Sequence, residues 1–201
     1  MLDAPVPEWL PAISDAKGYR PDSLESQIWE NKPIPDDFRD TVQKQIMRIV
    51  FAENGIGSLT SDSSIIELKL VQSKTNIQIR MIWVRPAAQM LKVFSCFMHA
   101  ILLRALKFGY RTLSIYDFSS NMESVIGRHF PDLFTVVGKD FVCDLSDKQQ
   151  LIEQKLASNP FFEVRDQSII LYNDFLNVTA AQLNDQEWQN ARKPAAAARG
   201  T

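Results

Sequence analysis

Two carboxylates, Glu67 and Asp117, are the residues whose type and position best suit acid-base chemistry. Glu67 falls in the alternating segment 66–70, and Asp117 falls near the end of segment 112–118, so both are expected on strands that flank a central cleft. An amine nucleophile must lose a proton before or during its attack, which requires a carboxylate or a water chain within hydrogen-bonding reach. Both residues are therefore candidate general bases.

Each carboxylate also has a purely structural interpretation. Glu67 can lie on the solvent face of a β-hairpin and pair with Arg80 across it. The functional case for Asp117 is stronger, because α/β proteins tend to bind ligands at the carboxyl ends of parallel strands. The sequence leaves both interpretations open.

The two histidines, His99 and His129, lie thirty residues apart, with no cysteine or carboxylate at a spacing that would complete a metal site. His99 falls off the apolar stripe of its helix, which predicts a position on the helix surface. For His129, which follows Arg128, a packing role is favoured over a catalytic one. The chain has no glycine-rich phosphate loop, nucleophile elbow or HExxH motif, so the common hydrolase and kinase signatures are absent.

Segment 76–121 must position these residues, and it has the pattern of strand, helix and strand. Alternating apolar residues predict a strand that ends at Pro86, and TLSIYDF at 112–118 predicts another. A helix of roughly twenty residues between two strands predicts a right-handed βαβ crossover with parallel strands. The expected fold class is α/β, with a mixed sheet built around this unit.

The connecting helix begins near Gln89 and stops at Gly109. Arg104 and Lys107 fall in its last turn, where a cation suits the negative end of the helix dipole. Its apolar residues recur at spacings of three and four, typical of a core-facing helix: Met90, Val93, Phe94, Phe97, Met98, Ile101, Leu102, Ala105 and Leu106.

We expect three parts along the chain: a proline-rich arm at 1–35, one α/β domain at 36–178, and a C-terminal helix with a disordered tail at 179–201. The arm holds Trp9 and Trp29; it either packs on the domain or docks a protein partner. The other elements expected are a helix capped by Asp36 or Asp37, a hairpin at 65–84, helices at 122–130 and 146–156, and strands at 134–137, 140–145 and 164–172.

Composition excludes several classes of protein. The formal net charge of −2 gives no basic field for nucleic acid or an anionic membrane. Two cysteines make a disulfide framework improbable, and the apolar run 93–103 is too short for a membrane span. The N-terminus lacks a signal-peptide pattern. We expect a cytoplasmic protein, and the sequence does not indicate its oligomeric state.

The order of hairpin, strand, Pro, helix, Gly, strand, Asn and short helix, over residues 65–142, resembles the core of the GCN5-related N-acetyltransferases. Trp83, Val84, Arg85 and Pro86 are similar to the end of that family's central strand. Asn121 stands where the family often places an Asn. The resemblance implies an acyl-CoA N-acyltransferase fold, with acetyl-CoA or another acyl-CoA as cofactor and Asp117 or Glu67 as base.

In that family the turn after Pro contains an Arg or Gln followed by glycines, and its amides bind the pyrophosphate at a helix N-terminus. The corresponding residues in this chain are Gln89, Met90, Leu91, Lys92, Val93 and Phe94. Gln89 fits the first position, but both glycines are absent. No Tyr stands near Arg128 and His129, where the family often has one. Arg85 and Lys92 are candidate side-chain cations in place of the glycines.

Three interpretations follow. The first is an acyl-CoA-dependent N-acyltransferase that acts on an amine and binds the cofactor through residues 84–92 and Asn121. The second is a catalytically inactive member of the same fold that serves as an interaction or assembly module. The third is another α/β arrangement with a similar βαβ unit. The position of a β-bulge in strand 77–84 would distinguish the third interpretation from the first two, because the resembled family opens its cofactor cleft where two parallel strands splay apart there.

Overall fold

The computed structural model describes residues 33–53, 55, 57–62, 65–89, 91–116, 120–172 and 176–185, with the backbone alone for residues 61, 62, 120 and 121. Arm residues 1–32 and tail residues 186–201 lie outside this description. The sheet strands are β1 (Gly57–Asp62), β2 (Ile66–Gln72), β3 (Asn76–Val84), β4 (Thr112–Ile115), β5 (Thr135–Val137) and β6 (Asp140–Asp144). The helices are α2 (Phe38–Phe51), α3 (Pro86–Gln89), α4 (Val93–Lys107), α5 (Ser120–His129) and α6 (Gln149–Ala157).

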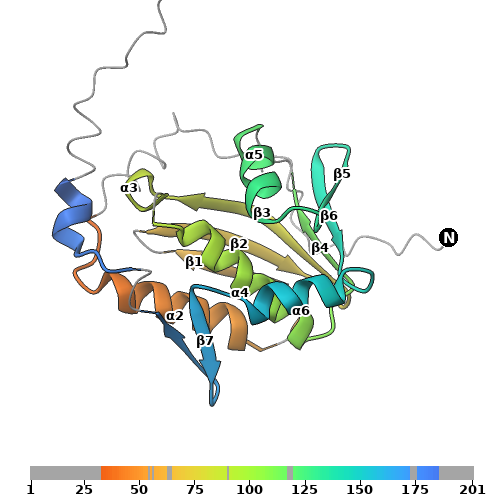
Figure 1. The fold of residues 1–201 in the computed structure, drawn as a ribbon, viewed down its shortest axis with the longest axis horizontal. Helices are drawn as coiled ribbons and strands as arrows, with labels where there is room; N and C mark the ends of the chain where they lie inside the picture. Colours follow the sequence, from red (N-terminus) through yellow and green to blue (C-terminus); the bar gives the residue numbers. More distant parts are fainter. Residues whose placement is uncertain are drawn as a thin grey trace, which may run out of the picture.

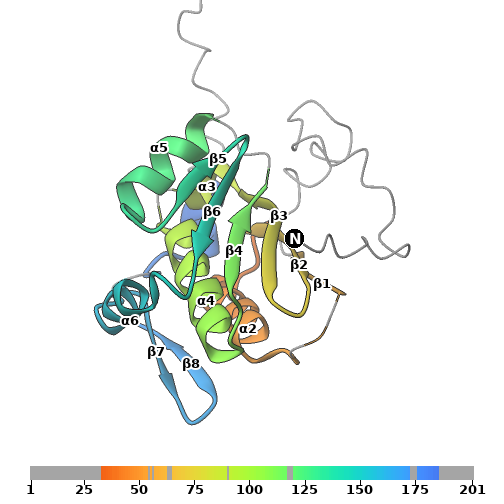
Figure 2. The same ribbon diagram turned by 90° about the vertical axis from the view of Figure 1, so that its right-hand side faces the viewer.

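Within the described residues, six strands form one mixed sheet in the order β1-β2-β3-β4-β6-β5. β3 and β4 are parallel and are joined through α4, whereas the other neighbours are antiparallel. Helices α2, α4 and α6 lie over the same face of the sheet (Figure 1), and α5 lies toward the top of the molecule (Figures 1 and 2). The predicted α/β class and its central βαβ unit are confirmed.

The predicted hairpin at 65–84 is also confirmed, since β2 and β3 pair from Ile66 and Val84 to Gln72 and Ile77. β1 was not expected. Its sequence, GSLTSD, has no run of alternating apolar residues. The strand is instead held in the sheet by backbone pairing with β2. Sequence periodicity detects a strand through the face it buries, so this edge strand gave no signal.

α4 begins at Val93, not near Gln89 as predicted, and runs through the core. From Val93 on its predicted apolar stripe is buried, except for the partly buried Phe94 and Leu106. The predicted surface position of His99 is wrong, because only 6% of the residue is exposed. Its ring contacts the rings of Phe130 and Phe161 at centroid distances of 5.3 and 5.1 Å. Segments beyond α4 in the chain therefore cover a face of the helix that its sequence marked as polar.

Arg104 is completely buried and binds the end of another helix. Its guanidinium donates to the carbonyl oxygens of Ile49, Ala52 and Glu53 at 3.0, 2.8 and 2.9 Å. These oxygens lie at the C-terminal end of α2, where helical carbonyls lack intrahelical partners. The sequence placed this cation at the end of its own helix, but in the structure it caps α2.

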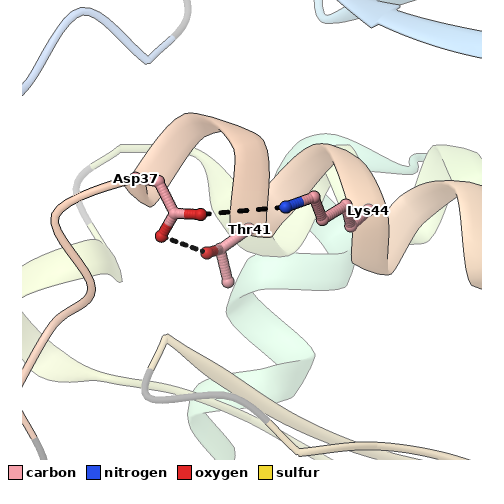
Figure 3. A network of polar contacts seen from close by, with 3 residues as sticks. All are labelled: Asp37, Thr41 and Lys44. Carbon is pink, nitrogen blue, oxygen red and sulfur yellow. Dashed lines mark hydrogen bonds and ion pairs between the residues drawn. The ribbon is translucent and has the colours of Figure 1, made fainter.

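The start of α2 is organised by Asp37, its N-cap residue, as predicted. Figure 3 shows Asp37 beside Thr41 and Lys44: one carboxylate oxygen accepts from the Thr41 hydroxyl at 3.1 Å, and the other lies 3.8 Å from Lys44 Nζ. The Asp37 side chain bonds no backbone amide of the first turn. Asp37 thus occupies the predicted N-cap position without a capping hydrogen bond, and its carboxylate contacts side chains one and two turns along the helix.

The C-terminal region differs from prediction. In place of one strand at 164–172, β7 (Phe162–Arg165) and β8 (Ser168–Leu171) form an antiparallel hairpin, because Asp166 and Gln167 have φ of 47° and 62° and form the turn. The hairpin packs on α2, where an Arg39 Nη donates to the carbonyl of Leu171, 132 residues away.

Two further findings concern α6 and the residues after the hairpin. α6 begins at Gln149 with Lys148 as its N-cap, so Ser146 does not cap it. Residues 180–185 are helical and contribute Ala180 and Leu183 to the buried hydrophobic cluster that begins at Ile34. No helix among the described residues has the length and apolar character needed to cross a membrane.

Candidate functional site

β3 and β4 separate partway along their length. Their parallel pairing runs from Asn76 and Thr112 to Ile79 and Ile115, and it ends where the amide of Tyr116 donates to the carbonyl of Ile79 at 3.0 Å. β3 continues to Val84 without further pairing to the described part of β4. Beyond this point that side of β3 has no strand partner among the described residues, at the carboxyl end of a parallel pair, which is the kind of place where α/β proteins bind ligands.

An irregularity in β3 lies at the same level. Leu70 of β2 pairs with Ile79, whereas the preceding Lys69 pairs with Met81. Arg80 is the extra residue, which is the arrangement of a β-bulge. A bulge increases local twist and bends its strand, and this one begins where β3 leaves β4.

The turn after β3 leads into the N-terminus of α4. Gln89 Nε2 donates to the carbonyl of Val84 at 2.9 Å, which closes the short helix α3 onto the end of the strand. Lys92 then adopts φ 59° and ψ 19° as the N-cap of α4, with no side-chain capping bond. This left-handed conformation is one that glycine adopts without steric cost, and here a lysine holds it.

The first turn of α4 has amides for which the described residues show no acceptor. The amide of Cys96 donates to the carbonyl of Lys92 at 3.0 Å. For the three preceding amides, those of residues 93–95, no acceptor is found in the part of the chain that the structure describes. Phe94 is half-buried and packs against the core. The positive end of the α4 dipole favours an anion at this position.

Positive side chains surround the same turn. Burial lowers the pKa of His129, and the charges of Arg128, Lys92 and Lys155 lower it further. Lys155 Nζ also donates to the carbonyl of His129 at 3.1 Å. Lys92 precedes α4, Arg128 and His129 end α5, and Lys155 lies in α6. Three helices thus contribute to one positive field, which we call the basic cluster (Lys92, Arg128, His129 and Lys155).

The structure brings together part of the predicted cofactor site. Val84, Gln89, Leu91 and Lys92 lie along the turn, but only Gln89 and Lys92 are exposed. Arg85, the other candidate cation, is 3% exposed, and its amide donates to the carbonyl of Ile65. Of the other predicted residues, Met90 and Asp117 lie outside the described residues, and Asn121 is described only by its backbone in α5.

Glu67 is half-buried in the middle of the sheet. Its register partners are Trp83 of β3 and Asp62 of β1, so Arg80 is not opposite it as the structural interpretation supposed. The structure describes Glu67 but not Asp117, the other candidate base. Sequence reasoning missed Arg80, Tyr116 and Lys155, whose positions depend on register and tertiary contacts.

Within the described ranges, no group of three or more metal-binding side chains occurs. The candidate site lies between β3, the start of α4 and the end of α5. No protein-family model, curated protein or solved structure matches this chain.

Proposed function

We propose that this protein is an acyl-CoA-dependent N-acyltransferase that transfers an acyl group to an amine. One observation carries the proposal: β3 leaves β4 at a bulge, and the open strand leads directly to a helix N-terminus that is surrounded by cations. An acyl-CoA has the matching chemistry, since its pyrophosphate is anionic and its pantetheine arm carries amides that can pair with a strand. The acyltransferase fold is part of this proposal.

The residues of the turn suit the phosphate end of the cofactor. The amides of residues 93–95 and the ammonium of Lys92 would bind the pyrophosphate, while Arg128 adds positive charge. The left-handed backbone at Lys92 supports this assignment, because the conformation that a glycine would favour is present without the glycine.

The chemistry requires a base and an open path for the amine. The amine attacks the thioester carbonyl, the C–S bond breaks, and the proton from nitrogen passes to a carboxylate or to water. Glu67 and Asp117 remain the candidate bases. Since no Tyr is present near Arg128 and His129, the thiolate is proposed to take its proton from water.

A second function, that of an inactive interaction module, is favoured by a specific observation. Gln89 bonds Val84, and Arg85 is buried, so two residues assigned to the cofactor are used by the fold itself. Such a turn would persist without a phosphate ligand. The partner would then be a protein, with the arm at 1–35 as the proposed docking segment.

Calorimetry of the full chain with coenzyme A, acetyl-CoA and pantetheine distinguishes the two functions. We expect saturable binding of both nucleotides by about 1 mM, which corresponds to about 4 kcal/mol, and no saturation with pantetheine. Lys92→Glu should weaken coenzyme A binding at least about tenfold, whereas Lys74→Glu, in the exposed β2–β3 turn, should not. Release of free thiol with an amine panel then tests transfer: binding without turnover favours the module, and no binding excludes the acyltransferase.

A further inference from the structure

Arg80 is a half-buried arginine that forms no hydrogen bond or ion pair within the described part of the chain. Its Nε is buried and lacks a hydrogen-bond partner. Its guanidinium carbon lies 4.2 Å from the ring centre of Tyr116. Withdrawing a charged donor from water costs free energy unless a partner compensates. A buried donor with no partner among the described residues is available to a ligand that completes it.

The position of Arg80 places this donor at the opening between the strands. Arg80 is the bulged residue of β3, next to Ile79, the last residue that bonds β4. Tyr116, which provides that last amide, also provides the ring on which the guanidinium stacks. Tyr116, the residue directly after β4, therefore ends the strand pairing and contacts the cation where β3 and β4 separate.

The geometry selects a planar anion. Stacking on Tyr116 uses one face of the guanidinium and leaves its N–H edges for a ligand. Two parallel N–H···O bonds match the two oxygens of a carboxylate. Lys69 lies at the adjacent register position of β2 and adds positive charge, whereas Glu67 lies two residues farther along, opposite Trp83.

We propose that Arg80 binds the carboxylate of the acceptor, so that the acceptor is an amine that also carries a carboxylate, such as an amino acid or a peptide C-terminus. The amine part of this assignment rests on the proposed function. The carboxylate part rests only on Arg80 and Tyr116, and it is testable without catalysis.

The test is ligand-observed NMR on the full chain with N-acetylated glycine, leucine and glutamine and with their amides. Each pair differs only in carboxylate against carboxamide. We expect the wild type and Arg111→Gln, which changes an exposed arginine, to bind at least one acid about tenfold more tightly than its amide. Arg80→Gln should reduce that preference to less than about twofold, and Arg80→Lys should retain only part of it, because lysine keeps the charge but lacks the fork.

Because Arg80 makes no hydrogen bond in the described structure, Arg80→Gln should fold, and its thermal transition is measured first. Tyr116→Leu provides a second variant: it keeps the cation and removes the stack, so the preference should fall. Equal binding of acids and amides by the wild type, an unchanged preference in Arg80→Gln, or stronger binding of O-phosphoethanolamine than of any acid would overturn the proposal.

The outcomes separate this proposal from the proposed function. A carboxylate preference that depends on Arg80, found in a protein that does not bind coenzyme A, supports the Arg80 site and removes the acyltransferase. Acyl transfer to amines with no carboxylate preference keeps the acyltransferase and removes the Arg80 assignment.

Discussion

Arg104 Nε donates to Gln72 Oε1 at 2.7 Å, which joins the central helix α4 to the end of β2. The same oxygen accepts from the Tyr110 hydroxyl at 3.1 Å. Arg104 also donates to the three carbonyls at the end of α2, so one buried side chain connects two helices and the sheet. Desolvation lowers its pKa, while the neighbouring Tyr110 opposes that shift.

Arg104→Lys should therefore be strongly destabilising. Lysine keeps the charge but has too few donors for four acceptors, and buried carbonyls would lose their partners. We expect a loss of about 3 kcal/mol in the free energy of unfolding, measured by denaturant titration. Arg111→Lys, at an exposed position, should change it by less than about 0.5 kcal/mol. A loss below about 1 kcal/mol for Arg104→Lys would mean that this hydrogen-bond network contributes little to the stability of the fold.

His99 should make stability depend on pH. Its Nδ1–H donates to the carbonyl of Ser95 at 2.7 Å, and burial lowers the pKa of the imidazole. The unfolded chain takes up a proton near the ordinary pKa of about 6.5, whereas the folded chain does so only at lower pH. Between these values the unfolded state binds more protons, so the free energy of unfolding should fall as pH decreases from 7 to 5.

The measurement is denaturant unfolding at pH 5, 6 and 7. The pKa of His129 is lowered as well, so it acts in the same direction, and His129→Gln serves as the matched control. His99→Gln should flatten the pH profile more than His129→Gln does, because His99 is the more deeply buried. A wild-type profile that is flat or rises toward pH 5 would contradict the assignment.

Lys92 and Lys148 offer a direct comparison, because both are helix N-caps and only Lys92 has a positive φ, 59° against −105°. Lys92→Gly should be more stable than Lys92→Ala by about 1 kcal/mol, since alanine strains in the left-handed region. At Lys148 glycine should have no such advantage over alanine. Thermal unfolding of the four variants tests this, and an equal glycine preference at both positions would rule out strain at Lys92.

Cys96 and Cys143 should resist alkylation in the folded protein. Burial raises the pKa of both thiols, that of Cys143 to about 11, so little of either is thiolate at pH 8, and only the thiolate reacts. Iodoacetamide labelling followed by mass spectrometry should show rates at least about a hundredfold slower than in denaturant. Rapid labelling of either cysteine without denaturant would indicate local opening of α4 or β6.

The sequence was most informative where a segment buries a defined face. The β2–β3 hairpin and the βαβ unit have clear periods of two and of three to four residues, so their existence and order were predictable. β1 and the β7–β8 turn were not, because an edge strand without an apolar face and a turn built from Asp166 and Gln167 lack these signals. His99 was misplaced because periodicity describes one helix and not the segments that later cover it.

The candidate site was predictable in part for the same reason. The end of β3 and the turn at Lys92 follow from local patterns. The basic cluster requires α4, α5 and α6 to meet, and Arg80 is recognisable only from the register of β3 against β2. The spacing of residues along the chain predicts neither the meeting of these three helices nor the register of the two strands.

The bond between Arg39 and Leu171 has a consequence for synthesis on the ribosome. α2 emerges more than a hundred residues before the hairpin that packs on it. The surface of α2 that the hairpin covers must therefore wait, exposed, for a later segment. Contacts so distant in sequence slow folding, and exposed intermediates are prone to aggregate, so slow elongation or truncation before β8 should yield chains that chaperones retain.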